Sequence, residues 1–430
     1  MKDRISEGTL PNRLAYCVRE TDIEKDEVML SLALKVGSLH ESDSENGLAH
    51  VVEHMSMVFD KYRYYTDDVQ YNSIGVTDFD RTVYVIKCPN RNEAVRHGLF
   101  ILKQIALGNY ITIEALDEVK QDVLQEVITN NKGINSKVLR IIFEDSFYKT
   151  RLPMGDEEVI KGLSFEQVKA FHEKWYTPDR MAINIAGDTR TDEVIKWIET
   201  EFGSLSCSSN AESNDMNRCY QLHLETGTIK KVVTSWKVNH LEMYISNMIS
   251  DEINIKNETC NHIFATVFEK ACVHAFKESN VEFSYFSSSF VNFMNCNQFL
   301  KMQIVYCSDL HEKITDVMER VFDHIQKDSI FLKSYFEETK QEYLEYFNSK
   351  AYLSDLALPN LMEESIDHFI LDDPLISYEQ RIQNLMKMMD DLSYIDIRIL
   401  AQQLLRYEDC LFIIFQGNSQ DFSLVSPKFR

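Results

Sequence analysis

The sequence is poor in glycine, proline and positive charge, and each shortage excludes a class of protein. Its 430 residues include 13 Gly and 7 Pro, too few for a collagen-like, linker-dominated or low-complexity chain. The 45 Lys and Arg are outnumbered by 68 Asp and Glu, which leaves a net charge of −23. Such a chain repels phosphate backbones, so we expect no nucleic-acid partner, whereas a neutral or cationic peptide suits it.

Long hydrophobic runs and paired cysteine motifs are also missing. No stretch approaches the ~18 apolar residues that a membrane-spanning helix needs, and Leu411–Phe415 has the length of a buried strand. The nine cysteines are scattered without a C-x-x-C pair, which disfavours zinc ribbons and a disulfide framework. The N-terminus has neither a secretory nor a transit-peptide pattern. Together these features predict a cytoplasmic protein with no membrane partner.

The composition changes in the middle of the chain, where the run SLSCSSNAESNDMN is rich in Ser and Asn and lacks periodicity. We therefore predict three segments: an N-terminal domain over residues 1–204, a linker over 205–217 and a C-terminal domain over 218–430. A weak repeat relates the two domains. Residues 164–188 and 393–418 both read as a helix, a polar break, an apolar strand and a glycine. Strands and helices are mixed within each part, which predicts the α+β class.

The sharpest local pattern lies in the run NGLAHVVEHMSMVF. Its apolar residues recur at helical spacing, and at about 100° per residue they gather on one side of a helix. His50, Glu53 and His54 fall together on the opposite side. Two imidazoles one turn apart can bind one metal ion, and the carboxylate beside them can take a proton from water. This H-x-x-E-H spacing is the inverted zincin pattern. The alternative is a solvated helix face that carries these residues by chance.

A third ligand is expected because catalytic zinc usually has three protein ligands and an open position. Residues 115–127 (ALDEVKQDVLQEV) form the best candidate helix, and Glu118, Asp122 and Glu126 make an acidic stripe along it. The stripe drifts by about 40° per step, so Glu126 ends nearest the apolar face. Glu126 is therefore the member expected to point inward. A fully solvated acidic stripe is the alternative.

Longer segments around these residues resemble the insulinase-like (pitrilysin-type) zinc metallopeptidase family, which includes the mitochondrial processing peptidases. The similar segments are VGSLHESDSENGLAHVVEHM, RTVYVIK, DVLQEV and residues 151–188. The resemblance implies zinc on His50, His54 and Glu126, with Glu53 as the general base. Glu126 follows His54 by 72 residues, within the range usual in the family. The resemblance also implies two homologous domains, each a mainly antiparallel sheet with helices on one face, which together form half of a clamshell.

The first half departs from the family pattern at two places. The family often has a second glutamate two turns before the ligand, where this chain has Val119. The adjacent Glu118 is then the candidate partner of the ligand. The substrate-binding edge strand of the family usually reads Asn-Ala where this chain has Ile74 and Gly75. A peptide substrate could still add to this strand through backbone hydrogen bonds, with one side-chain anchor fewer.

The second half departs further. Lys277 stands where the family's second domain supplies an Arg to the site, and Tyr285 matches its Tyr with one inserted residue. A lysine cannot reproduce a bidentate guanidinium, so we expect a heterodimer in which a homologous subunit supplies Arg and Tyr. A homodimer that uses Lys277 and Tyr285 is one alternative, and an exposed lysine with a packed tyrosine is another. This half contains no second H-x-x-E-H, which predicts one zinc ion per chain.

The sequence thus predicts a zinc endopeptidase that cleaves peptides or unstructured precursor segments inside an enclosed chamber. A narrower hypothesis is removal of a leader peptide from a small precursor, with this chain as the catalytic subunit. The alternative from another functional class is a non-catalytic, peptide-binding partner subunit. Such partners in the family usually lack H-x-x-E-H, which this chain keeps.

Overall fold

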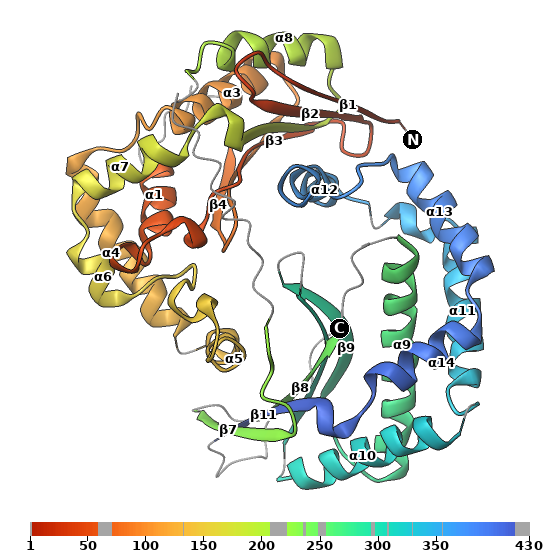
Figure 1. The fold of residues 1–430 in the computed structure, drawn as a ribbon. Coiled ribbons are helices and arrows are strands. Elements are labelled where there is room, and N and C mark those ends of the chain that lie inside the picture. The colour runs from red at the N-terminus through yellow and green to blue at the C-terminus, as the bar shows by residue number, and fades with distance from the viewer. Residues whose placement is uncertain are drawn as a thin grey trace. The chain divides into compact units, whose positions relative to one another are not determined.

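The computed structural model divides the chain into two compact units (Figure 1). The first comprises Met1–Arg218 with Leu353–Gln380, and the second comprises Cys219–Tyr352 with Arg381–Arg430. The structure describes residues 2–58, 71–131, 133–206, 222–234, 238–247, 255–293, 297–307, 309–328, 330–354 and 356–417. Most of the predicted linker at 205–217 lies outside these ranges.

A six-stranded sheet forms the base of the first unit, in the spatial order β1-β2-β6-β3-β5-β4. Its strands are β1 (Asp3–Thr9), β2 (Ala15–Thr21), β3 (Glu27–Leu34), β4 (Asn72–Thr77), β5 (Thr82–Pro89) and β6 (Met181–Gly187). Neighbouring strands are antiparallel except β2 and β6, which are parallel. The sequence explains their places. β6 reads MAINIAG and is buried along its whole length inside the sheet, whereas β4 alternates exposed and half-buried residues at the edge.

The second unit contains a five-stranded sheet in the order β7-β11-β8-β10-β9. Its strands are β7 (Thr228–Thr234), β8 (Asn239–Asn247), β9 (Tyr285–Phe293), β10 (Asn297–Tyr306) and β11 (Cys410–Gly417). If the strands are numbered along the chain from β2 in the first unit and from β7 in the second, both sheets have the same spatial order: first, fifth, second, fourth, third. In both, the first and fifth strands form the one parallel pair. This shared topology confirms the prediction of two homologous α+β domains with mainly antiparallel sheets.

Helices of the first unit cover one face of its sheet and enclose a large apolar core. They are α1 (Leu48–Ser56), α3 (Asn92–Ala106), α4 (Ile113–Asn130), α5 (Ile134–Ile142), α6 (Glu157–Gly162), α7 (Phe165–Trp175) and α8 (Thr191–Phe202). The start of α7 is defined by a capping box in which Ser164 and Gln167 exchange hydrogen bonds of 2.9 and 3.3 Å. Helix α1 packs against β4, α4 and α7, so it is held on three sides.

The opposite face of the first sheet is covered by α12 (Leu358–Leu371), a helix from late in the sequence. Four of its apolar residues follow one another at i, i+4 spacing and pack on β3, β5 and β6: Leu358, Met362, Ile366 and Ile370. The fully buried Arg19 on β2 pairs with Glu364 of α12 at 2.5 Å, and it also pairs with Asp3 of β1 at 2.7 Å. The first unit therefore includes a segment that lies beyond the predicted residues 1–204.

The second unit is completed by helices that pack on one face of its sheet around a separate core. They are α9 (Ile255–Glu278), α10 (His311–Lys327), α11 (Lys333–Asn348), α14 (Tyr394–Leu404) and the greater part of α13 (Tyr378–Asp391), whose first residues belong to the first unit. Along the chain, α9 follows the second strand of its unit and precedes the third, and α1 has the same place between β3 and β4 in the first unit. Within the part of the chain that the structure describes, no helix is both long enough and apolar enough to cross a bilayer.

Candidate metal centre

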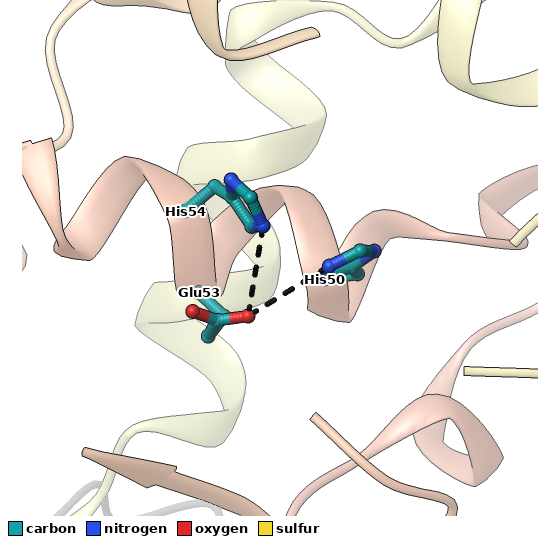
Figure 2. A group of neighbouring side chains, drawn as sticks. All are labelled: His50, Glu53 and His54. Carbon is teal, nitrogen blue, oxygen red and sulfur yellow. Dashed lines mark ion pairs between the residues drawn. The ribbon is translucent and has the colours of Figure 1, made fainter. Parts of the chain in front are cut away.

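The centre lies on α1, which has one apolar and one polar face. Apolar side chains anchor the helix in the core of the first unit: Leu48, Val51, Val52 and Met55. His50, Glu53 and His54 project together from the other face, as Figure 2 shows. The helix begins after Gly47, which has a φ of 104° that favours glycine. A β-carbon at this position would also lie 2.7 Å from the side chain of Ile160.

The three polar side chains of α1 converge closely. Both imidazoles turn Nε2 toward Glu53, at 3.9 Å from its Oε2 for His50 and 4.0 Å for His54 (Figure 2). One ligand atom from each of the three residues lies within 4.8 Å of the others. Within the described residues, this is the one group of three or more His, Cys, Asp or Glu side chains gathered so tightly.

Glu126 on α4 completes the cluster from a neighbouring helix. Its Oε2 lies 3.6 Å from Nε2 of His50, and its Oε1 lies 3.7 Å from Nε2 of His54. The apolar positions of α4 are buried, among them Val123 and Val127, and hold the helix so that Glu126 faces α1. The structure places the members of the acidic stripe differently. Glu126 approaches both imidazoles, whereas Glu118 lies two turns earlier on an exposed part of the helix.

This donor set fits a zinc ion. Zinc binds His nitrogen and carboxylate oxygen at about 2.0–2.2 Å in a tetrahedral arrangement, in which neighbouring ligand atoms stand about 3.3–3.6 Å apart. The separations from Glu126 to the two Nε2 atoms, 3.6 and 3.7 Å, are close to that edge length. The Glu126 side chain is 50% exposed and that of His54 is 22% exposed, so the cluster opens to solvent on this side. A substrate or water therefore has access to a fourth position.

The pKa values of the two carboxyl groups at the centre are shifted in opposite directions. Burial raises the pKa of Glu53 to about 7. The His50 imidazole beside Glu126 lowers the pKa of that carboxyl. Two carboxyl groups with separated pKa values can take different roles, one as an ionised ligand and one as a proton acceptor near neutral pH.

Edge strand β4 approaches the centre at Gly75. A β-carbon on Gly75 would lie 1.9 Å from Oε1 of Glu53, so the observed position of that carboxylate requires glycine. The sequence shows Gly75 only as a departure from the family's alanine. In the structure, the absence of a methyl group at this position leaves room for the Glu53 carboxylate. Ile74 and Val76 on the same strand are 62% and 49% exposed. β4 pairs with β5 alone among the described strands.

The other predicted site residues lie in the second unit. Lys277 is exposed near the end of α9, and Tyr285 is 48% exposed at the start of β9. They are close along the chain, on either side of the turn that joins this helix to this strand. Neither belongs to the cluster on α1 and α4, and their part in catalysis stays a prediction.

One polar contact at this centre was missed in the sequence. The buried Glu41 accepts hydrogen bonds from the backbone N–H groups of Gly47 and Ala49, at 2.9 and 2.7 Å. The run Glu41–Glu45 contains three acidic residues, and their order along the chain gives no sign of which one turns inward.

Comparisons with known proteins find similar sequences among peptidases. A sequence model described as Insulinase (Peptidase family M16) matches residues 16–154, and one described as Peptidase M16 inactive domain matches residues 162–343. The probable zinc protease PqqL of Haemophilus influenzae is 30% identical over 211 residues, 45% of this chain and 23% of that protein. The mitochondrial-processing peptidase subunit beta of Blastocladiella emersonii is 27% identical over 205 residues, 46% of this chain and 43% of that protein.

Solved structures match over nearly the whole chain. The periplasmic protease PqqL from Escherichia coli superposes with a TM-score of 0.82 at 18% identity, over 97% of this chain and 48% of that chain. A protease from Helicobacter pylori superposes with a TM-score of 0.74 at 14% identity, over 97% of this chain and 100% of that one. The chain therefore spans about half the length of the PqqL structure, and less than half of each of the two curated relatives aligns with it.

Proposed function

Because this chain belongs to the insulinase (M16) family of peptidases, we propose that it is the zinc-bearing half of an endopeptidase that cleaves extended, unstructured peptide segments. The observation that carries this proposal is the convergence of His50, His54 and Glu126, with the buried Glu53 beside them. A protein that only bound peptides would need neither this donor set nor a carboxyl whose pKa is raised to about 7.

Each residue of the centre has a distinct role in this proposal. His50, His54 and Glu126 would hold zinc, which supplies a Lewis acid for the substrate carbonyl and a lowered pKa for water. Glu53 accepts a proton from the attacking water and then donates it to the departing amine, so one carboxyl serves as base and acid in turn. Its position against Gly75 keeps the carboxylate beside the edge of the sheet.

Strand β4 is the proposed binding place for the substrate backbone. An extended peptide can add to a sheet edge through main-chain hydrogen bonds, and side chains that alternate along it then meet the strand's own side chains. The exposed Ile74 and Val76 share one face of β4 and offer apolar neighbours to such a peptide. Gly75 between them brings the strand backbone next to Glu53.

A second subunit is part of the proposal. The positions that correspond to the family's Arg and Tyr carry Lys277 and an offset Tyr285, whereas the three proposed zinc ligands are all present. Removing one donor that stabilises a developing oxyanion typically costs about 10²–10³ in rate. We propose a homologous subunit that supplies those groups. Removal of a leader segment from a precursor fits the similarity to a mitochondrial-processing peptidase subunit. A cytoplasmic location stays a prediction.

The test is cleavage of a panel of unstructured peptides by the zinc-loaded chain, alone and with candidate homologous subunits. Glu53→Gln, matched to wild type in zinc content, should lose about 10²–10⁴ in turnover because the general base is gone. Glu114→Gln, an exposed change in the first turn of α4, is the matched control and should leave turnover unchanged. Equal turnover of Glu53→Gln and wild type would overturn the role of Glu53. Peptide binding without cleavage under every condition would favour a non-catalytic partner subunit.

A further inference from the structure

Glu41 occupies an unusual place for a carboxylate, since it is fully enclosed behind the start of α1. Its side chain lies in the segment just after the 3-10 turn Ser38–His40, and the residue is 3% exposed. Oε2 accepts from the N–H of Gly47 at 2.9 Å, and Oε1 accepts from the N–H of Ala49 at 2.7 Å. Burial raises the pKa of Glu41 to about 8. Enclosing a carboxyl group in this way is costly, so a specific benefit is expected.

The groups that Glu41 binds are those that a helix leaves without partners. The first N–H groups of an α-helix have no carbonyl one turn earlier, and a side chain near the N-cap usually satisfies them. The N-cap of α1 is Gly47, which has no side chain to do this. Glu41 supplies two acceptor oxygens instead, one to each of these backbone N–H groups.

The start of α1 matters because the helix is short. It has nine residues, and His50 is the third of them, directly after Ala49. Fraying of the first turn would therefore displace His50, while His54 sits a full turn deeper. The surrounding loop is fixed as well. Ser38 donates a 2.6 Å hydrogen bond to the carbonyl of Arg151, and Asp156 donates one of 3.2 Å to the carbonyl of Asn46.

We propose that Glu41 is a positioning residue for the metal centre, whose carboxyl group holds the first turn of α1 and thereby places His50 for metal binding. This inference rests on the proposed zinc site. It assigns Glu41 no contact with metal or substrate. Its effect passes through the backbone of Gly47 and Ala49 to the adjacent imidazole.

The experiment compares metal binding by wild type and Glu41→Gln. Glutamine keeps one acceptor oxygen, but its amide N–H₂ faces the other backbone N–H, so one hydrogen bond is lost. We expect zinc affinity to fall by about 10-fold, the lower end of the effect of removing a direct partner of a metal ligand, because Glu41 acts through the backbone. The visible spectrum of the Co²⁺-loaded variant should also change, since displacement of His50 alters the ligand field. Glu41→Asp keeps both oxygens and should recover part of the affinity.

Two controls separate positioning from a general loss of stability. Glu45→Gln neutralises a half-buried carboxylate in the same loop, which accepts a 2.9 Å hydrogen bond from the backbone N–H of Ser42. This variant should bind zinc within twofold of wild type. Ser38→Ala removes the anchor to Arg151, so it should lower the melting temperature without changing zinc affinity or the Co²⁺ spectrum. If Glu41→Gln does not fold, Glu41→Asp carries the same comparison.

The outcomes distinguish this inference from the proposed function. If wild type binds zinc and Glu41→Gln binds it equally well with an unchanged Co²⁺ spectrum, the positioning role of Glu41 is refuted and the zinc site stands. If Ser38→Ala weakens zinc binding as much as Glu41→Gln does, the effect is one of stability and the inference is again refuted. If wild type itself binds no zinc at the centre, the proposed function fails first.

Discussion

Replacing Glu53 by glutamine is expected to stabilise the metal-free protein, and to do so more strongly as the pH rises. The reason is the burial of Glu53, which raises the pKa of its carboxyl from 4.5 to about 7. Between these two values the folded state keeps a proton that the unfolded state has already released. The stabilising contribution of that proton is complete below pH 4.5 and is lost as the pH rises through 7.

The magnitude follows from the two pKa values. Their difference of about 2.5 units corresponds to about 3 kcal/mol of unfolding free energy above pH 7. Glutamine cannot ionise, so the variant avoids this loss. The same linkage makes the variant more stable than wild type by about 2 kcal/mol at pH 6.0 and by about 3 kcal/mol at pH 8.5, so the difference grows by roughly 1 kcal/mol over the interval.

The assay is urea unfolding of EDTA-treated wild type and Glu53→Gln at pH 6.0 and 8.5, followed by tryptophan fluorescence. Two of the three tryptophans, Trp175 and Trp197, lie in the first unit, so the signal reports mainly on the unit that holds Glu53. Glu126→Gln is the control. Because the pKa of Glu126 is lowered in the folded state, this carboxyl stabilises the protein above the ordinary pKa of a glutamate, and that stabilisation is lost only at acidic pH. The stability difference between Glu126→Gln and wild type should therefore not change between pH 6.0 and 8.5. The reasoning would be refuted if the difference in unfolding free energy between Glu53→Gln and wild type were the same at both pH values.

Further predictions concern the ligands, the edge strand and the partner. His50→Ala should lose bound zinc, as measured by elemental analysis after dialysis, and full zinc content would contradict its role as a ligand. Gly75→Ala should keep zinc but lose about 10²-fold in turnover, because a β-carbon would lie 1.9 Å from Oε1 of Glu53 and displace a group whose placement matters within about 1 Å. Unchanged turnover would show that the carboxylate works equally well from another position. Lys277→Ala should leave the peptidase activity of the heterodimer intact. Loss of activity in this variant, in a preparation of this chain alone, would favour a homodimer instead.

Much of the centre could be predicted from sequence because helical periodicity determines which residues share a face. The spacing of His50, Glu53 and His54 predicts their convergence, and the drift of the acidic stripe singles out Glu126. The structure brings these four side chains together, while their roles as ligands and base stay predictions. The repeat was visible in the sequence only as a helix followed by a strand. The strand order of the two sheets establishes it over whole units.

Other features depend on packing that no local pattern encodes. The apolar stripe of α12 predicts an amphipathic helix, but it carries no sign that its partner is the sheet of the first unit. The role of Gly75 depends on a contact with a helix about twenty residues earlier in the chain, which only the folded structure reveals. Glu41 is likewise set apart from Asp43 and Glu45 by burial alone, since all three read as loop acids in the sequence.

The most direct test of the proposed zinc centre is an anomalous difference map, measured at the zinc absorption edge from crystals of the zinc-loaded chain. We expect one strong peak in the first unit, bound by Nε2 of His50, Nε2 of His54 and the carboxylate of Glu126. Each ligand atom should lie about 2.0–2.2 Å from the peak, with Glu53 beside it and not among the ligands. A peak elsewhere in the chain, or one that lacks His50, His54 or Glu126 as a ligand, would contradict the assignment of α1 and α4 as the catalytic zinc site.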